Sequence, residues 1–402
     1  MTKTTQYKNT PVGQIPKDWE VKRLGELGEI SSGGTPSTAI DEYWNGEINW
    51  CTPTDISALT TEYLYETSIK ITEIGLKNSS AKVLPPYSII VCTRATIGKA
   101  AINLNPMSTN QGFKNIIPKN IDYKYLYYKI LAEENGLKRI ANGSTFLEVS
   151  KTDFENFQIP LPPLPEQQKI AEVLSTWDKA IQKTDAIIKK LEERNKGLAF
   201  SLLRGKLVSK NTKELPLSKF LTFTPREVEK PKETYLALGI RSHGKGIFHK
   251  TDSDPKAISM DKLYEVKEND FIVNITFAWE HAVAIISKED EGGLVSHRFP
   301  TYVINTNLVS VEFFRYVILQ PFFKQMLDNI SPGGAGRNRV LSKKDLLKLK
   351  IKVPSIEEQN TIADILNTAN QELKHYQNKL EALKQQKKGL MQQLLTGKVR
   401  TI

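Results

Sequence analysis

Residues 159–174 read IPLPPLPEQQKIAEVL, and residues 351–366 repeat them as IKVPSIEEQNTIADIL. The two stretches belong to a longer repeat, in which residues 149–208 align without a gap to residues 341–400 at an offset of 192, with 19 identities in 60 positions. A long internal repeat constrains the architecture before any local feature is considered. We therefore expect two equivalent structural units within one chain.

Each copy of the repeat begins with a strand-like apolar run, at 157–161 and 349–353, followed by a proline-containing turn and acidic residues that favour a helix N-terminus. Apolar residues then recur at alternating steps of four and three, which is the spacing of a coiled-coil seam. The seam has a polar residue at the same place in both copies, Asn195 and Lys387, where it can set the register. The predicted seam residues are Ile170, Leu174, Trp177, Ile181, Ile188, Leu191, Leu198 and Leu202 in the first copy, and Ile362, Leu366, Leu373, Tyr376, Leu380, Leu383, Leu390 and Leu394 in the second.

Helices of roughly 38 residues would be about 57 Å long, more than most globular domains bury around one helix. We expect the two helices to pack on each other, and to run antiparallel because a globular segment separates the end of one from the start of the next. The alternative is two unrelated amphipathic helices on two separate cores. Unrelated helices have no reason to share both register and termini.

The segments between the helices share a plan of strands and helices. Hydrophobic runs at 88–93 and 271–275 each follow a turn and predict strands, and helices are expected at 123–132 and 311–327. The predicted fold class is α/β, in the mixed α+β form. Two globular domains, 1–160 and 214–352, are separated by two long helical segments, 161–213 and 353–402, that form an antiparallel coiled coil with a pseudo-twofold internal repeat.

Composition excludes several classes of protein. The 402 residues include only two cysteines, which argues against a disulfide framework or a structural zinc site. No apolar run approaches the roughly 18 residues of a membrane span, so we expect a cytoplasmic protein without a membrane partner. The net charge of +11 favours an anionic partner such as nucleic acid, but residues 1–160 hold 17 basic and 17 acidic residues and are neutral.

No catalytic motif is evident in the sequence. The pair Gly98-Lys99 lacks the hydroxyl residue and the first glycine of a phosphate-binding loop. Pro85-Pro86 follows an apolar residue rather than an amine acceptor, so we interpret it as a turn. Glu265-Val266-Lys267 resembles part of a nuclease centre but is more typical of a solvated strand end. We predict no catalytic residue, no metal site and no cofactor in this chain.

Several motifs together resemble the DNA specificity subunit of type I restriction-modification systems, over essentially the whole chain. They are Ile15-Pro16-Lys17-Asp18-Trp19 with Leu24-Gly25-Glu26, Ser32-Gly33-Gly34-Thr35-Pro36-Ser37 with Tyr43-Trp44 and Gly46, the run from Pro160 to Ala171, and the helix end from Leu202 to Leu207. The second copy departs from the pattern at Ser355 and Glu357, where the first has Pro163 and Pro165. This departure affects the backbone conformation that we expect where the chain enters the second helix.

The resemblance implies that the chain is not itself an enzyme. Each globular domain would be a target recognition domain that reads one half of a bipartite, asymmetric site in double-stranded DNA. The helical segments would set the spacer between the half-sites and dock two methylation subunits, which carry S-adenosylmethionine and methylate adenine at N6. Restriction subunits with endonuclease activity can join such a complex.

Candidate DNA contacts follow from the chemistry of base and phosphate recognition. Arginine, asparagine and glutamine side chains read base edges, whereas lysine, serine, threonine and backbone N–H groups hold phosphate. In the first domain the candidates are Ser32, Gly33, Gly34, Thr35, Ser37, Thr38, Thr93, Arg94, Thr96, Asn110, Gln111, Lys114, Ser144 and Thr145. In the second they are Arg241, Ser242, His243, Lys245, Asn274, Thr276, Trp279, His281, His297, Arg298, Arg337, Asn338 and Arg339.

Each candidate also has a structural interpretation. The two glycines could form a plain turn, Trp279 could be a core aromatic and Arg94 could belong to a surface ion pair. A rival function is a coiled-coil scaffold that binds protein rather than DNA, which would explain the repeat equally well. A complete restriction enzyme in one chain is disfavoured because the catalytic motifs are missing.

Overall fold

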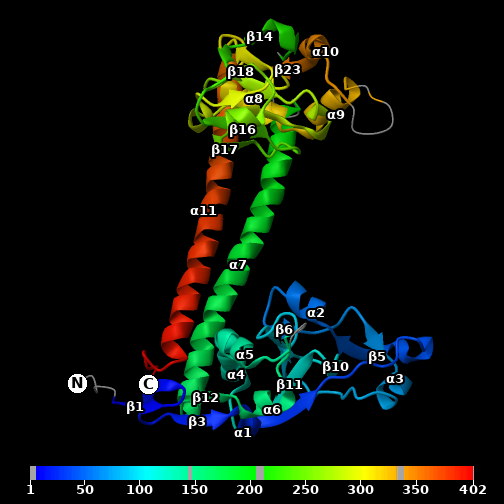
Figure 1. Cartoon of the computed structure of the whole chain (residues 1–402), viewed down its shortest axis with the longest axis vertical. Coiled ribbons are helices and arrows are strands. Elements are labelled where there is room, and N and C mark those ends of the chain that lie inside the picture. The colour runs from blue at the N-terminus through cyan, green and yellow to red at the C-terminus, as the bar shows by residue number, and fades with distance from the viewer. Residues whose placement is uncertain (1–5, 144–146, 205–211, 332, 334–338, 402) are drawn as a thin grey trace. The chain divides into compact units, whose positions relative to one another are not determined.

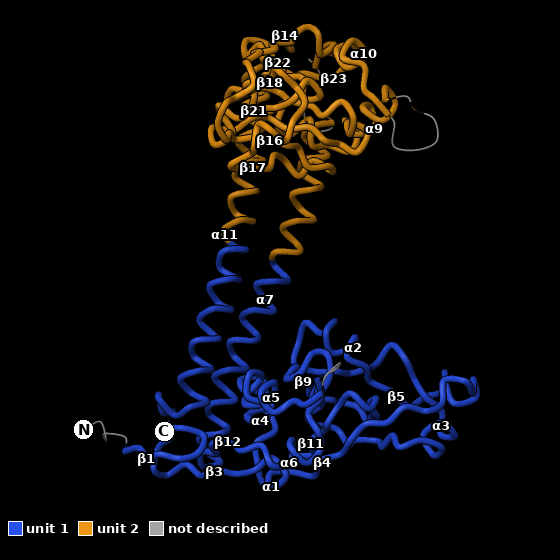
Figure 2. Tube along the Cα trace, viewed as in Figure 1, with its two compact units in different colours: residues 1–187, 376–402 blue, residues 188–375 orange. Residues whose placement is uncertain are grey.

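A computed structural model describes residues 6–143, 147–204, 212–331, 333 and 339–401. The chain divides into two compact units: unit 1 is Met1–Ile187 with Tyr376–Ile402, and unit 2 is Ile188–His375 (Figure 2). Both long helices, α7 (Leu164–Leu203) and α11 (Ile356–Leu394), cross this division (Figure 1). Each unit therefore contains part of both helices. The four sequence segments proposed above follow the chain rather than these units, and their boundaries remain a prediction.

Unit 1 is built on a five-stranded sheet in the order β4-β11-β8-β9-β6, with a three-stranded sheet β10-β5-β7 and the pairs β1-β2 and β12-β3. Its strands are β1 (Tyr7–Thr10), β2 (Gly13–Pro16), β3 (Glu20–Arg23), β4 (Gly28–Ser32), β5 (Trp44–Cys51), β6 (Tyr63–Leu64), β7 (Lys70–Ile71), β8 (Ile89–Cys92), β9 (Ala100–Asn103), β10 (Met107–Thr109), β11 (Phe113–Pro118) and β12 (Gln158–Leu161). Its shorter helices are α1 (Leu24–Leu27), α2 (Pro53–Ala58), α3 (Glu73–Lys77), α4 (Tyr123–Ala132), α5 (Glu134–Ile140), α6 (Lys151–Asn156) and the 3₁₀ turn η1 (Asp41–Tyr43).

Unit 2 contains a four-stranded sheet in the order β14-β22-β19-β20, a five-stranded sheet β15-β18-β21-β16-β17 and the pair β13-β23. Its strands are β13 (Lys213–Pro216), β14 (Leu221–Phe223), β15 (Glu227–Glu229), β16 (Tyr235–Ile240), β17 (Ile247–Ser253), β18 (Lys262–Glu265), β19 (Phe271–Val273), β20 (Val283–Ile285), β21 (Leu294–Val295), β22 (Thr301–Ile304) and β23 (Lys350–Val353). Its helices are α8 (Val311–Ile318), α9 (Pro321–Asn329), α10 (Lys343–Lys348) and the 3₁₀ turns η2 (Leu217–Lys219), η3 (Pro255–Ala257), η4 (Ala278–Glu280) and η5 (Lys288–Asp290).

The central sheets of the two units have the same strand order. The order β4-β11-β8-β9 in unit 1 corresponds to β14-β22-β19-β20 in unit 2, with antiparallel pairing throughout. Strand β8 is buried along its whole length because its sequence, Ile-Ile-Val-Cys, is continuously apolar and suits a strand covered on both faces. The mixed α/β class and the duplicated plan predicted from the repeat are confirmed.

One predicted helix is wrong in its extent. The segment 311–327 forms two helices, α8 and α9, with a break at Leu319 and Gln320. Gln320 has extended backbone angles and Pro321 occupies the first position of α9. A residue before proline is disfavoured in the helical region, so the proline ends one helix and starts the next. The helix expected at 123–132 has those bounds in the structure, as α4.

The two long helices pack antiparallel, as predicted. In unit 1, Ile170 and Leu174 near the start of α7 share a core with Leu394 at the end of α11. In unit 2, Leu202 at the end of α7 shares a core with Ile362 and Leu366 near the start of α11. All sixteen predicted seam residues are buried or half-buried. The alternative of two helices on unrelated cores is excluded.

The polar residue in each seam makes a polar contact with the opposite helix. In unit 1, Lys387 Nζ lies 2.5 Å from Asp178 Oδ1, and the Tyr128 hydroxyl of α4 donates to Asp178 Oδ2 at 2.6 Å. In unit 2, Asn195 Nδ2 donates to Asn370 Oδ1 at 3.3 Å, and Asn370 Nδ2 donates to the Tyr316 hydroxyl of α8 at 3.1 Å. The same three-residue connection, charged in one unit and neutral in the other, ties each sheet domain to the helices.

The end of the chain is bound into unit 1. Arg400 Nε donates to Glu166 Oε1 at 2.7 Å, and Arg400 Nη2 lies 2.6 Å from Asp18 Oδ2. The indole N–H of Trp19 donates to the other Glu166 oxygen at 2.9 Å, and the Glu166 side chain is fully buried. Hydrogen bonding to Glu166 and to Asp18 raises the pKa of Arg400 despite partial burial. The acidic residue expected at the start of α7 thus also anchors the last residues of the chain.

Neither a membrane-spanning helix nor a metal site is found among the described residues. None of the helices there combines the length and apolarity needed to cross a bilayer. No three His, Cys, Asp or Glu side chains in the same ranges gather closely enough to hold a metal ion.

Candidate nucleic-acid interface

In unit 1 the predicted contact residues that the structure describes come from three segments, which meet at one edge of the central sheet. They are the loop after β4, the residues after β8 and the turn between β10 and β11. Thr93 N donates to Gly112 O at 2.8 Å, and Gly34 N donates to Thr109 O at 2.9 Å. Thr35 and Gln111 are joined by a side-chain hydrogen bond. Residues separated by up to 80 positions in sequence therefore form one local surface.

Gly33 and Gly34 allow two backbone segments to approach each other. A Cβ on Gly33 would lie 1.8 Å from Asn110 O, and a Cβ on Gly34 would lie 2.4 Å from Ala81 N. Both glycines are buried. Gly33 lets the loop pack against β10 and the turn after it, and Gly34 lets the loop pack against Ser80 and Ala81. The two glycines therefore do not present an open backbone surface.

The remaining candidates of unit 1 differ in accessibility. Thr93 is fully buried, and its hydroxyl donates to Gly112 O at 3.1 Å. Lys114 is also buried. Ser37, Thr38 and Gln111 are exposed, whereas Ser32, Thr35, Arg94, Thr96 and Asn110 are half-buried. Ser144 and Thr145 lie outside the described residues. The accessible candidates are thus a subset of those predicted.

Glu148 joins two of the predicted residues. Its carboxylate lies 2.6 Å from Arg94 Nη2 and 3.2 Å from Lys114 Nζ. Burial disfavours the charged carboxylate, but the hydrogen bonds from Arg94 and Lys114 outweigh this effect and lower the pKa of Glu148. The interpretation of Arg94 as part of an ion pair therefore describes its contact in this structure. No spacing or motif in the sequence pointed to Glu148.

Unit 2 places its candidates at the equivalent edge. Ile275 N donates to Arg298 O at 3.0 Å, as Thr93 N does to Gly112 O in unit 1. Leu341 N donates to Ile275 O at 2.8 Å, as Val149 N does to Thr93 O at 3.1 Å. The segments 274–281, 296–300 and 339–341 are therefore neighbours. The paired backbone contacts show that the two edges are built alike.

Several side chains of this edge are in contact. Asn274 is buried, and its Oδ1 accepts from Thr276 N at 3.0 Å. The Trp279 indole donates to Thr276 O at 3.2 Å, and the Arg339 guanidinium lies 5.4 Å from the Trp279 ring centroid. Arg339 Nη1 lies 2.7 Å from Asp328 Oδ1 in α9. Asp328 was not among the predicted residues. Arg337 and Asn338 lie outside the described residues.

The hairpin between β16 and β17 contributes a second group. Ser242 Oγ donates to Glu280 Oε2 at 2.6 Å, and Arg241 Nη1 donates to Ile247 O at 2.8 Å. His281 is buried, with Nε2 2.6 Å from Ile318 O, and burial lowers its pKa. His281 therefore supports α8 from the interior. The exposed members of the predicted set in unit 2 are Arg241, His243, Lys245, His297 and Arg298.

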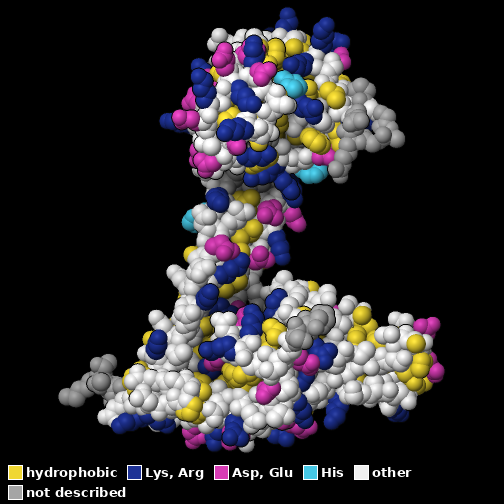
Figure 3. Space-filling view, viewed as in Figure 1, with side chains coloured by type: hydrophobic (Ala, Val, Ile, Leu, Met, Phe, Trp, Pro, Cys, Tyr) yellow, Lys and Arg dark blue, Asp and Glu magenta, His cyan; other side chains and the backbone are white. Residues whose placement is uncertain are grey.

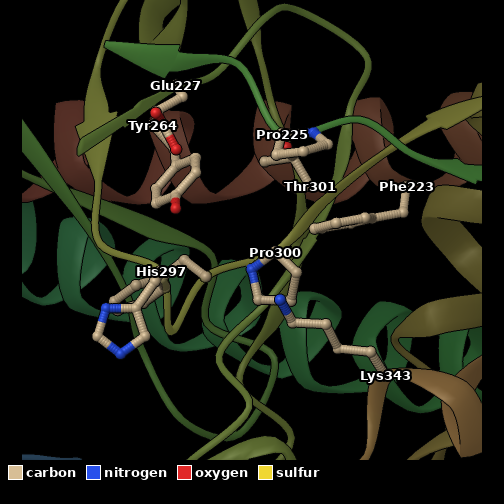
Figure 4. A pocket seen from close by; sticks show the side chains of 9 residues that line it. Phe223, Pro225, Glu227, Tyr264, His297, Pro300, Thr301 and Lys343 are labelled. Atoms are coloured by element: carbon tan, nitrogen blue, oxygen red, sulfur yellow. The ribbon is translucent and has the colours of Figure 1, made fainter. Parts of the chain in front are cut away.

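A cavity of about 410 Å³ opens beside the predicted residue His297. In the close view of Figure 4, Glu227 and Tyr264 approach it from one side and Phe223 and Lys343 from the other. Lys343 Nζ lies 4.6 Å from the centroid of the Phe223 ring. A second hollow of about 390 Å³ is lined by two predicted residues, Ser242 and Asn274. Both hollows lie in unit 2 and combine aromatic walls with polar groups.

The charge of these surfaces is mixed. On the face shown in Figure 3, Lys and Arg side chains of each unit are interspersed with Asp and Glu side chains. A mixed surface attracts DNA less strongly than a continuous basic patch does.

Comparison with known proteins agrees with this architecture. Residues 16–193 and 227–385 match the family described as the type I restriction modification DNA specificity domain. The MjaVIII specificity subunit of a type I restriction enzyme of Methanocaldococcus jannaschii is 26% identical over 99% of this chain and 97% of that protein. The MjaIX specificity subunit of the same organism is 44% identical, over 46% of this chain and 45% of that protein.

A solved structure shares the fold. The crystal structure of the type I restriction-modification S subunit from M. genitalium superposes with a TM-score of 0.52, at 17% identity, over 97% of this chain and 98% of that chain. The family match covers most of the chain and falls on both units, with their duplicated sheets and shared antiparallel helices. The chain therefore belongs to the family of type I restriction modification DNA specificity domains.

Proposed function

We propose that this chain is the non-catalytic DNA specificity subunit of a type I restriction-modification complex and that each sheet domain reads one half of a bipartite, asymmetric DNA site. The observation that carries the proposal is the duplicated edge. The accessible candidates at corresponding ends of the two central sheets include Arg, Asn, Gln and Thr side chains in unit 1, and Arg, His and Thr side chains in unit 2. Two similar but chemically different edges suit two different half-sites.

The partners follow from this assignment. Two methylation subunits dock on the paired helices and supply S-adenosylmethionine and the adenine-N6 methyltransferase activity, and restriction subunits can join. The length of the helices sets the spacer between the half-sites. The complex acts on host and foreign DNA in the cytoplasm. The names of the relatives MjaVIII and MjaIX, both specificity subunits, support this proposal.

A selection experiment tests the proposal. The chain is reconstituted with its methylation subunit and mixed with duplexes that carry a randomised central region, and the bound DNA is sequenced. We expect two short base sequences at a constant spacing. Enrichment of a single short sequence, or of none, would contradict reading by two domains. Replacing residues 1–160 with the matching domain of a relative should change one of the two sequences and leave the other unchanged.

The coiled-coil scaffold that binds only protein is the rival function. It predicts a stable complex with no enriched DNA sequence. Among the relatives compared, those named are specificity subunits of restriction enzymes, which favours DNA recognition over the scaffold.

A further inference from the structure

Two ion pairs connect the predicted DNA-reading edges to carboxylates from other parts of the chain. In unit 1, Arg94 Nη2 lies 2.6 Å from Glu148 Oε2. In unit 2, Arg339 Nη1 lies 2.7 Å from Asp328 Oδ1. Each carboxylate holds one terminal guanidinium nitrogen, and the two arginine side chains stay partly exposed, at 43% and 31%. Each edge thus presents one restrained arginine.

We propose that Glu148 and Asp328 are specificity-determining positioning residues, each of which holds its arginine in the orientation that reads a guanine edge. This proposal rests on the proposed function, because it requires that the two edges face DNA. Guanine presents two acceptors, O6 and N7, to the major groove, and an arginine fork can bind both. Among the described residues, neither guanidinium makes another hydrogen bond or ion pair, so nitrogens remain available for the base.

The restraint of Arg94 is built into the fold. Glu148 N donates to Asn142 O at 3.0 Å, and the next residue, Val149, donates its N–H to Thr93 O at 3.1 Å. The backbone on both sides of the ion pair is therefore held. Lys114, whose side chain is 6% exposed, lies 3.2 Å from the other Glu148 oxygen and keeps the carboxylate in place. The cluster carries one net positive charge.

Arg339 is restrained by a helix residue and an aromatic ring rather than by a backbone-anchored glutamate. Asp328 lies in the last turn of α9, and the Trp279 ring faces the guanidinium at 5.4 Å. At the repeat offset of 192, Glu148 corresponds to Val340, so the two ion pairs are not copies of one ancestral pair. Each domain takes the carboxylate for its arginine from a different segment.

The energetic effect of such a carboxylate differs between cognate and other DNA. A free arginine side chain samples many rotamers, and less rotamer entropy is lost on binding when the guanidinium is already oriented. The same carboxylate repels phosphate, which weakens binding where no base contact compensates. Glu148 and Asp328 should therefore strengthen binding to the correct base and weaken binding to other DNA.

Arg226 and Arg298 of unit 2 lack this arrangement. Arg226 makes two contacts with Asp270, but the Asp270 side chain is only 4% exposed, which indicates a structural pair. Arg298 is exposed and makes no ion pair with any described residue. We assign Arg298 to phosphate contact, since an unrestrained side chain suits that role.

The test uses the complete complex of this chain with its methylation subunit. Binding of Glu148→Gln is measured by fluorescence anisotropy against the selected duplex, a panel with each base pair changed in turn, and unrelated DNA. We expect discrimination at one position of one half-site to fall about tenfold, since a good arginine–guanine contact contributes roughly 1–3 kcal/mol. Binding to unrelated DNA should tighten. Asp328→Asn should do the same at one position of the other half-site.

Control variants separate the proposed role from general effects. Glu29→Gln removes one negative charge from an exposed pair with Lys119 at 3.7 Å and should leave discrimination unchanged. Arg94→Lys keeps the positive charge but lacks the two-pronged guanidinium group. It should lose discrimination at the same base-pair position as Glu148→Gln. This second variant keeps the test informative if Glu148→Gln does not fold.

Several outcomes overturn the proposal. An equal loss of affinity at every position indicates a structural role for Glu148. Unchanged discrimination in Arg94→Lys shows that this arginine reads no base. If the unmodified complex discriminates among the duplexes but both carboxylate variants behave like it, this inference fails alone. If the unmodified complex discriminates nowhere, the proposed function fails with it.

Discussion

His281 couples the stability of unit 2 to pH at the scale of a single residue. Its ring is buried against Ile318 O, and burial lowers its pKa below the usual value near 6.5. The unfolded chain therefore binds a proton more readily as pH falls. The contribution of neutral His281 to stability is present above pH 6.5 and is lost as pH falls below it.

The variant His281→Asn tests this coupling. Asparagine tolerates the left-handed conformation that His281 adopts at φ 66°, and it does not titrate. Urea unfolding of the full chain between pH 5 and pH 7.5 should show a smaller loss of stability on acidification in the variant. The same pH dependence in both proteins would assign the effect to another group.

Arg400 should make a large contribution to the stability of unit 1. In Arg400→Met the fully buried Glu166 carboxylate keeps the Trp19 indole but loses its cationic partner. An uncompensated buried charge costs about 3 kcal/mol or more. Arg194→Met removes a pair with Glu372 in which both side chains are 45% exposed, and should cost less than about 1 kcal/mol. Similar unfolding midpoints for the two variants would refute this difference.

Only part of the candidate site could be predicted at this scale. Residue types after the strands pointed to Arg94, Asn110, Gln111 and Thr276, which the structure brings to two edges. Burial could not be foreseen for Thr93, because a shift of one residue at a strand reverses the face that a side chain occupies. It could not be foreseen for His281 either, because this residue follows the turn η4 and is buried by a contact with Ile318, which is distant in sequence. Glu148 and Asp328 were missed because ion-pair partners distant in sequence leave no local pattern.

At the scale of elements, Asp178 should stabilise the pairing of the long helices in unit 1. In Asp178→Ala the Lys387 ammonium, whose side chain is 14% exposed, loses its carboxylate, and the Tyr128 hydroxyl loses an acceptor. We expect a loss of about 3 kcal/mol in chemical unfolding. The equivalent Asn370→Ala in unit 2 removes only neutral hydrogen bonds and should cost about 1 kcal/mol. Equal losses would show that the charge is unimportant.

The elements were predicted best where the pattern was long. Eight apolar seam positions in each helix, which fall on alternating steps of four and three, left little ambiguity about α7 and α11. The break between α8 and α9 was missed although Pro321 was visible, because the apolar spacing of 311–327 continues across it. Local proline geometry prevailed over hydrophobic periodicity at that point.

At the scale of the whole molecule, the repeat predicted duplication but not the division of the structure. Each long helix is divided between the two units. Unit 1 includes Tyr376–Ile402, and unit 2 includes most of the second half of α7. Sequence segments follow the chain, whereas compact units follow contacts. Contacts between antiparallel helices join residues that are far apart in sequence.

The isolated chain should bind DNA weakly. Residues 1–160 carry no net charge, so few phosphates are neutralised there. We expect a Kd on the order of 10 µM at physiological salt, measured by anisotropy, and substantially tighter binding after the methylation subunits are added. Nanomolar binding by the chain alone that persists at high salt would contradict this expectation.

The most direct test of the central claim is to co-express the chain with its methylation subunit and map methylated adenines across the host genome by long-read sequencing. Reading of DNA by two domains predicts one bipartite motif with a constant spacer. Exchange of residues 1–160 should then change one half of that motif only. A stable complex that methylates no defined motif, or a motif that changes in both halves, would contradict the account.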